Sequence, residues 1–131
     1  MRGPALRPST LAPRGVPAAR TRAERFDETA LRVMRAVVGR WIAELGQVEL
    51  AVEEVPVLPA GWTDASVPLA AYVTATANRA PRLVLFRRPL EHRADGPVEL
   101  ESLLLTVVVE QLADVLGIPA EDVHPGYEGE D

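Results

Sequence analysis

The sequence predicts an α+β fold, in which an N-terminal amphipathic helix and a buried C-terminal helix accompany a small mixed sheet of three to four strands. Three patterns predict it: apolar residues recur at helical spacing from residue 26, a strand-like alternation starts at residue 48, and a mostly apolar helical pattern ends before Gly117. The chain has 131 residues, of which 47% are apolar, so it is long enough for one domain with a small core.

Residues 1–20 differ in composition from the rest of the chain. They hold four prolines and four arginines and no acidic residue. Such a stretch buries too little apolar surface to offset the entropy of ordering it, so we expect a disordered Arg/Pro-rich tail. A basic tail can attract phosphate groups, but no aromatic residue accompanies these arginines, so we do not expect nucleic acid as a partner.

The sequence contains no cysteine, which excludes disulfides, thiolate zinc sites and thiol nucleophiles. No apolar run reaches the length of a membrane span, and no apolar block follows the N-terminal arginines as it would in a secretory signal. We therefore expect a cytoplasmic protein without a membrane partner. The sequence does not indicate the oligomeric state.

The first predicted helix begins after Thr21 and ends at Gly46. Thr21 and Glu24 have the spacing of a capping box, in which each side chain accepts a hydrogen bond from the amide of the other residue. Glycine is a typical residue just after a helix end. The apolar residues that recur at helical spacing are Phe26, Ala30, Val33, Met34, Val37, Trp41 and Leu45.

Three strands are expected after this helix. Residues 48–53 alternate apolar and acidic side chains, which is typical of a half-buried strand. A proline-rich loop over residues 54–68 separates it from a second strand near residues 69–76 and a third over residues 82–87. The unbroken apolar centre of the third strand predicts burial on both of its faces.

A loop over residues 89–97 leads to the last long element, which we expect to be a helix over residues 98–116. Pro97 suits a first helical turn, and Gly117 suits the residue after the last one. The β-branched centre of this segment would also suit a strand, but polar residues at steps of three and four favour a helix with one polar face. These polar residues are Glu99, Ser102, Thr106, Glu110 and Asp114.

The order of these elements and three stretches within them resemble a known family, the small, minimal zincin-like metallopeptidases of bacteria. The resemblance covers roughly residues 21–123 and implies a zincin-like domain there. It leaves the tail of residues 1–20 before the domain and an acidic tail of residues 124–131 after it. The three stretches are RAERFD (22–27), LVLFRRPLE (83–91) and the segment 105–122.

The metal motif of this family resembles His-Glu-x-x-His-x-x-Gly-x-x-Asp. Its two histidines, one helical turn apart, bind zinc together with a residue after the glycine, and its glutamate is the general base. When the motifs are aligned on Gly117, this resemblance places Glu110 and Asp114 at the histidine positions, Gln111 at the glutamate position and Ala120 at the third ligand.

The segment Glu110-Gln111-Leu112-Ala113-Asp114 is thus a degenerate form of the zinc motif. The amide of Gln111 cannot accept a proton at neutral pH, so the resemblance implies that no catalytic residue is left. Zinc is the cofactor of the family, and for this chain we expect none.

The two acidic residues at the histidine positions, Glu110 and Asp114, are open to three interpretations. They continue the polar face of the helix and can simply be solvated, they can hold a harder cation such as Mg²⁺ or Ca²⁺, or they can contact a partner. His92 and His124 lie far apart in the sequence, and we expect each at the surface. A third ligand beside Glu110 and Asp114 could come from Glu121, Asp122 or His124.

Three functions follow from these observations. The first is a non-catalytic pseudo-peptidase that binds a peptide or protein, and the second is a metal-dependent hydrolase with a rearranged carboxylate site at Glu110 and Asp114. The third is an electrostatic adaptor that uses the basic and acidic tails. We expect the first, because every catalytic position of the motif is substituted while the flanking sequence is retained.

Overall fold

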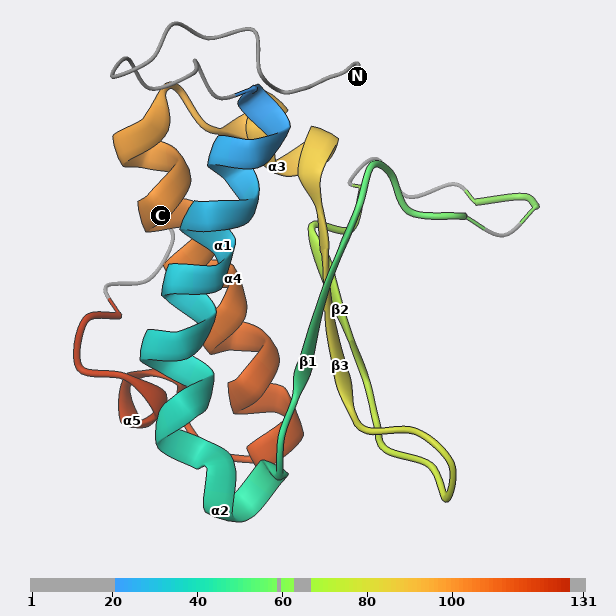
Figure 1. Ribbon diagram of the computed structural model, residues 1–131, viewed down its shortest axis with the longest axis vertical. Coiled ribbons are helices and arrows are strands. Elements are labelled where there is room, and N and C mark those ends of the chain that lie inside the picture. The colour runs from blue at the N-terminus through green and yellow to red at the C-terminus, as the bar shows by residue number, and fades with distance from the viewer. Residues whose placement is uncertain (1–20, 59, 63–66, 128–131) are drawn as a thin grey trace, which may run out of the picture.

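The computed structural model describes residues 21–58, 60–62 and 67–127, and it has a layer of helices beside a three-stranded sheet (Figure 1). This confirms the predicted α+β class with an N-terminal helix and a small mixed sheet. The tail predicted for residues 1–20 lies outside the described residues. The elements in chain order are α1 (Arg22–Val38), η1 (Gly39–Trp41), α2 (Ile42–Leu45), β1 (Glu49–Glu53), β2 (Ala70–Val73), β3 (Arg82–Phe86), α3 (Arg87–Arg93), α4 (Pro97–Leu116) and α5 (Ala120–Val123).

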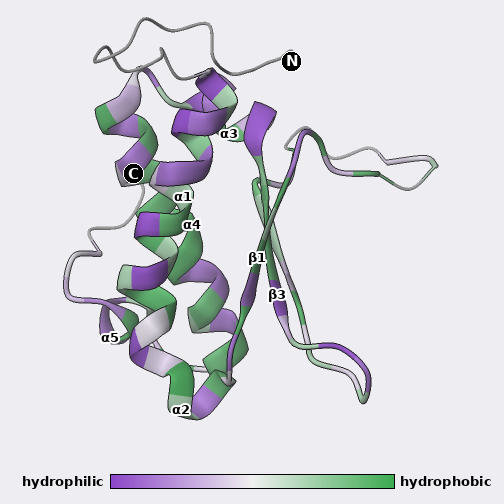
Figure 2. Cartoon of the chain, viewed as in Figure 1, coloured by the Kyte–Doolittle hydropathy of each residue, from purple (hydrophilic) through white to green (hydrophobic). Residues whose placement is uncertain are grey.

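The predicted first helix consists of α1, the 3₁₀ turn η1 and α2, and it ends at Gly46 as expected. Its capping box is present: the Glu24 amide donates to Thr21 Oγ1 at 3.0 Å, and the Thr21 amide donates to Glu24 Oε1 at 2.9 Å. Hydrophilic and hydrophobic bands alternate along α1 (Figure 2), and its hydrophobic side, from Phe26 to Val38, is buried.

The sheet has β3 at its centre, with β1 parallel to it on one side and β2 antiparallel on the other. On the face toward the helices, Leu50 of β1 and Tyr72 of β2 flank Leu83 of β3. Every residue from Leu83 to Phe86 is buried, which confirms the predicted burial of this strand on both faces. The central strand therefore ties both edge strands to the core.

The predicted C-terminal helix is α4, which packs against both α1 and β2. Pro97 lies in its first turn and Gly117 ends it with a left-handed φ of 70°, a conformation that favours glycine. The predicted polar face is wrong at Thr106, which is only 9% exposed. The other residues of the predicted polar face, Glu99, Ser102, Glu110 and Asp114, are exposed as expected.

Residues 87–93 form the short helix α3, where the sequence analysis expected the end of a strand and a loop. Pro89 is tolerated because it lies in the first turn, where its missing amide removes no helical hydrogen bond. Leu90 is fully buried and anchors α3 to the core. A helix held by a single apolar side chain has no periodicity that the sequence could reveal, and this explains the wrong prediction.

No helix in the described part of the chain is long and apolar enough to cross a membrane.

Candidate functional site

The positions aligned with the zinc motif lie at the C-terminal end of α4 and at the start of α5. Glu110 and Asp114 are one helical turn apart and both exposed, whereas Gln111 is half-buried. Ala120 is the first residue of α5, and its methyl side chain has no atom that can bind a metal ion. The structure thus brings two carboxylates onto one exposed surface, and the third motif position adds no ligand to them.

The Glu110 carboxylate has a partner that the sequence analysis missed, Tyr127. The Tyr127 phenol donates a hydrogen bond of 2.7 Å to Oε2 of Glu110. The Tyr127 ring is half-buried and packs against the core. The one signal in the sequence was that Tyr127 is the only aromatic residue after Gly117, in a segment otherwise interpreted as an acidic tail. The carboxylate that the sequence alignment places at the first histidine position therefore bonds to the chain itself.

A second contact holds the segment after α4 in place. The indole Nε1 of Trp41 donates to the backbone carbonyl of Val123 at 3.0 Å, and the Val123 side chain is fully buried. Trp41 was predicted only as part of the apolar face of the first helix. Its polar atom joins the end of that helix to α5, so the segment that carries Tyr127 is fixed at two points.

His124 lies between these two contacts, and its geometry argues against a role as a metal ligand. Its Nδ1 accepts a hydrogen bond of 2.9 Å from the Gly126 amide. In a neutral imidazole that accepts through Nδ1, the proton is on Nε2, so neither nitrogen offers a free lone pair to a metal ion. His92 lies on α3, at the other end of α4, and is exposed. The two histidines are thus not brought together.

The side chains at the motif positions do not fit the zinc ion of the family. A catalytic zinc site supplies three protein ligands, of which at least one is usually histidine or cysteine. Here Glu110 already accepts a hydrogen bond, Asp114 is a second carboxylate and Ala120 has no donor atom. Within the described residues, no group of three or more His, Cys, Asp or Glu side chains could hold a metal ion.

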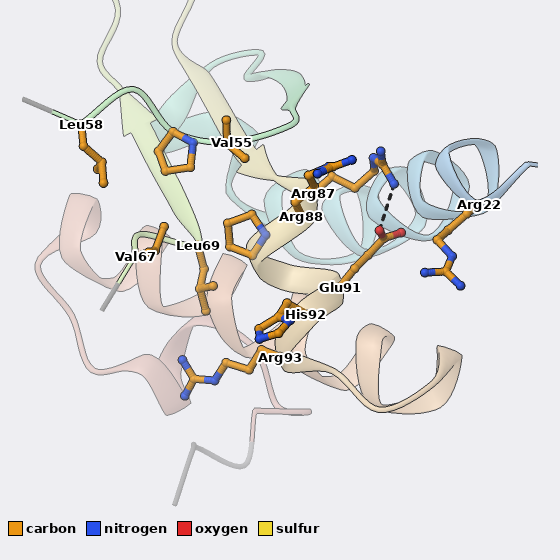
Figure 3. A pocket seen from close by; sticks show the side chains of 12 residues that line it. Arg22, Val55, Leu58, Val67, Leu69, Arg87, Arg88, Glu91, His92 and Arg93 are labelled. Carbon is orange, nitrogen blue, oxygen red and sulfur yellow. Dashed lines mark hydrogen bonds and ion pairs between the residues drawn. The ribbon is translucent and has the colours of Figure 1, made fainter. Parts of the chain in front are cut away.

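A concavity of about 1100 Å³ lies elsewhere, at the carboxyl ends of the parallel strands β1 and β3 and along α3 (Figure 3). Apolar side chains line one side of this groove, and arginines with Glu91 and His92 line the other. Four arginines against one glutamate give the lining a formal charge of +3, on a chain whose net charge is −5. The apolar lining consists of Val55, Pro56, Leu58, Val67, Leu69 and Pro89.

Arg87 lines the groove, and its side chain is held by two carboxylates. Its guanidinium makes two hydrogen bonds to the Glu54 carboxylate, one of them from Nε at 2.9 Å, and Nη1 donates to Glu91 at 2.9 Å. These bonds link Glu54, the residue after β1, to Arg87 at the start of α3, and Arg87 to Glu91 one turn further along α3. The hydrogen bonds from Arg87 hold the pKa of Glu54 below its usual value of 4.5, and burial opposes the shift in part.

Arg87 is therefore already paired, and other cations of the groove are more accessible to a ligand. The Arg88 side chain is 71% exposed and lies 3.5 Å from Glu54. The side chains of Arg22 and His92 make no hydrogen bond or ion pair with any residue in the described part of the chain. This groove, which the sequence analysis did not anticipate, thus combines an apolar wall with available positive charge.

The chain matches a known protein family over most of its described residues. The family model described as zincin-like metallopeptidase matches residues 45–129, which is more than half of the chain. The chain belongs to this family. This confirms the resemblance found in the sequence, with different limits: the match begins at the end of α2 and continues past Ala120 and Tyr127. No match was found among curated proteins.

The motif alignment predicted from the sequence falls within this match, on α4 and the turn at Gly117 that ends it. The groove at α3 lies near the start of α4, and none of the described residues that line it belongs to α4 or α5. The positions aligned with the motif and the groove at α3 are therefore two separate candidate sites on one zincin-like domain.

Proposed function

We propose that this zincin-like protein has lost the zinc ligands and the catalytic glutamate and acts as a non-catalytic pseudo-peptidase that binds a peptide or protein. The observation that carries the proposal is the hydrogen bond between Tyr127 and Glu110. It engages the residue at the first histidine position with the protein's own chain, while Gln111 replaces the general base. An amide cannot activate a water molecule, so the usual hydrolysis has no base.

The groove at α3 supports the binding role. An extended peptide could place apolar side chains against Val55 and Leu69 and acidic side chains toward Arg22 and Arg88. Charge complementarity of this kind selects partners and speeds their association. The groove combines an apolar side with a positively charged side, which suits a peptide that carries both apolar and acidic residues.

Metal content and activity test the loss of catalysis. We expect the purified, untagged chain to contain no stoichiometric zinc by elemental analysis and to leave a fluorescent casein substrate intact when zinc is added. One equivalent of zinc, or zinc-dependent cleavage that a Glu110→Ala variant loses, would contradict the proposal.

Peptide binding tests the second half of the proposal. Fluorescently labelled peptides of alternating glutamate and valine are titrated with the full chain, and fluorescence anisotropy gives the Kd. We expect the double variant Arg22→Glu, Arg88→Glu to bind roughly tenfold or more weakly, because it reverses two charges of the groove. The matched control is Arg40→Glu, Arg79→Glu, which changes the net charge equally on exposed residues that do not line the groove. Equal weakening by both pairs would refute the groove as the binding site.

A metal-dependent hydrolase with a rearranged carboxylate site at Glu110 and Asp114 is the alternative. The observation in its favour is that both carboxylates are exposed one turn apart on α4. It requires saturable binding of Mg²⁺, Mn²⁺ or Ca²⁺ in calorimetry, with loss of that binding in Glu110→Ala and Asp114→Ala. Heat of binding that both variants retain would rule out this site.

A further inference from the structure

The strand β1 forms an edge of the sheet, and one row of its backbone groups points away from β3. The Glu49 amide donates to the Pro81 carbonyl at 2.9 Å, so the groups of Glu49 face the neighbouring strand. Backbone groups alternate in direction along a strand, and those of Leu50 and Val52 therefore face the free edge. Within the described residues no strand pairs with this edge. An open edge of this kind can accept an added strand.

An apolar groove runs beside the same edge, between β1 and α1. Two adjoining hollows of about 420 and 700 Å³ share Leu31 of α1 and Leu50 of β1. Leu31 is 38% exposed and Ile42, at one end of the groove, is 52% exposed, although both belong to the helical segment that packs on the core. The side chains of Leu50 and Val52 face this helix layer. In a strand added to β1, every second side chain would lie next to Leu50 and Val52 and contact Leu31 of α1.

The charged side chains beside this edge indicate the charge that an added strand should have. Glu49 and Glu53 of β1 are exposed. Glu49 and Asp27 line the larger hollow, and Arg35 lines the smaller one, so the acidic side chains outnumber the basic one. Two copies of β1 paired antiparallel about Ala51 would place Glu49 of one copy opposite Glu53 of the other, and like charges directly opposite are destabilising. A strand with basic residues at these positions would instead be attracted.

We propose that the free edge of β1, with the groove between α1 and β1, binds an extended segment of alternating apolar and basic residues as a fourth strand of the sheet. This inference rests on the proposed role as a binding module, but it uses a different surface and the opposite charge from the groove at α3. Apolar side chains of the segment contact Leu31, Leu50 and Val52, and its basic side chains lie over Glu49 and Glu53.

The probe is a labelled peptide of about seven residues that alternates arginine and valine, which is long enough to cover a strand of this length. We expect saturable binding to the full chain and about tenfold slower hydrogen exchange of the Leu50 and Val52 amides, since an added strand would engage both. The control peptide has the same composition with its arginines and valines in two blocks. Equal binding of the block peptide, or binding without protection of these two amides, overturns the proposal.

Variants with matched controls complete the test. We expect Leu31→Asp to weaken binding of the alternating peptide about tenfold, whereas Val115→Asp, with the same 38% exposure on α4, leaves it unchanged. Glu49→Arg, Glu53→Arg is compared in the same way with Glu121→Arg, Asp122→Arg on α5. If each variant and its control behave alike, the edge is not the site. Amide protection that rises with protein concentration in the absence of peptide would mean that a second copy covers the edge, and this also overturns the proposal.

The glutamate–valine peptide, titrated into the same samples, separates this inference from the proposed function. If it still binds at the groove of α3 while the arginine–valine peptide does not bind, only the inference about β1 fails. If neither peptide binds, both fail.

Discussion

The two ends of α4 differ in how their polar side chains are satisfied. At the C-terminal end, Glu110 bonds to Tyr127, His124 bonds to Gly126, and Trp41 bonds to the backbone of Val123. At the other end, the groove at α3 has exposed cations beside an apolar wall. A ligand binds through groups that it can still satisfy. The groove at α3 offers more of them than the surface around Glu110, where the carboxylate and the imidazole of His124 already bond to the chain.

We expect the largest change in stability, in the presence of zinc, from restoring the zinc motif. The fourfold variant Glu110→His, Gln111→Glu, Asp114→His, Ala120→Asp re-creates the family pattern before and after Gly117. If α4 and α5 keep the family geometry, it should bind zinc, and zinc at about a thousandfold excess over its Kd would stabilise the fold by about 4 kcal/mol. Thermal unfolding with and without zinc measures this.

The control for the restored motif is the same variant with Asp114 unchanged, which lacks one of the two histidines. A restored variant that binds zinc no better than this control would mean that the motif end has changed in backbone geometry as well as in side chains.

The segment after α4 should contribute to the stability of the fold through the buried side chain of Val123. Val123 is fully buried, so Val123→Asp places a carboxylate in the core and should cost about 3 kcal/mol or more of unfolding free energy. The neighbouring Asp122→Val adds an exposed apolar residue and should change the stability by less than about 0.5 kcal/mol. Urea unfolding of both variants compares them. Similar stabilities would show that α5 does not contribute to the fold.

The third prediction isolates the contact at the first motif position. Tyr127→Phe removes the hydrogen bond to Glu110 but keeps the packed ring, and it should lower the unfolding free energy by about 1 kcal/mol. Asp114→Asn, on the same exposed surface, is the control and should have almost no effect. Urea unfolding and hydrogen exchange of the residue 127 amide measure this. If Tyr127→Phe is as stable as the original chain and its amide exchanges no faster, the hydrogen bond does not hold this segment.

The sequence predicted the fold more completely than it predicted either candidate site. Long helices such as 22–45 and 98–116 could be predicted, because the spacing of their buried apolar residues repeats many times along the sequence. The short helix α3 and the contact between Tyr127 and Glu110 depend on residues far apart in the chain. The groove at α3 likewise combines residues from α1, the segments beside β1 and β2, and α3. Such convergence is a property of the tertiary structure and leaves no local pattern.

The smallest expected effect concerns the open end, where Arg87 joins Glu54 to Glu91. The pKa of Glu54 is lowered in the folded state, mainly by its hydrogen bonds from Arg87, so the contact stabilises the fold above the ordinary pKa of 4.5. This stabilisation is lost as the pH falls through the lowered pKa, because the carboxyl group is then protonated in both states.

Glu54→Gln should therefore be slightly less stable than the original chain at pH 7, and the difference should shrink toward zero in acid. The effect is small because the Glu54 side chain is 56% exposed and water screens its charge. Unfolding by urea at pH 7, 5 and 3 measures it, with Glu53→Gln on the exposed face of β1 as the control. A difference that stays constant over this range would mean that Glu54 acts through its shape and not its charge. The groove would then not depend on this ion pair for its form, and its contrast with the surface around Glu110 would rest on its exposed cations, Arg22 and Arg88 among them.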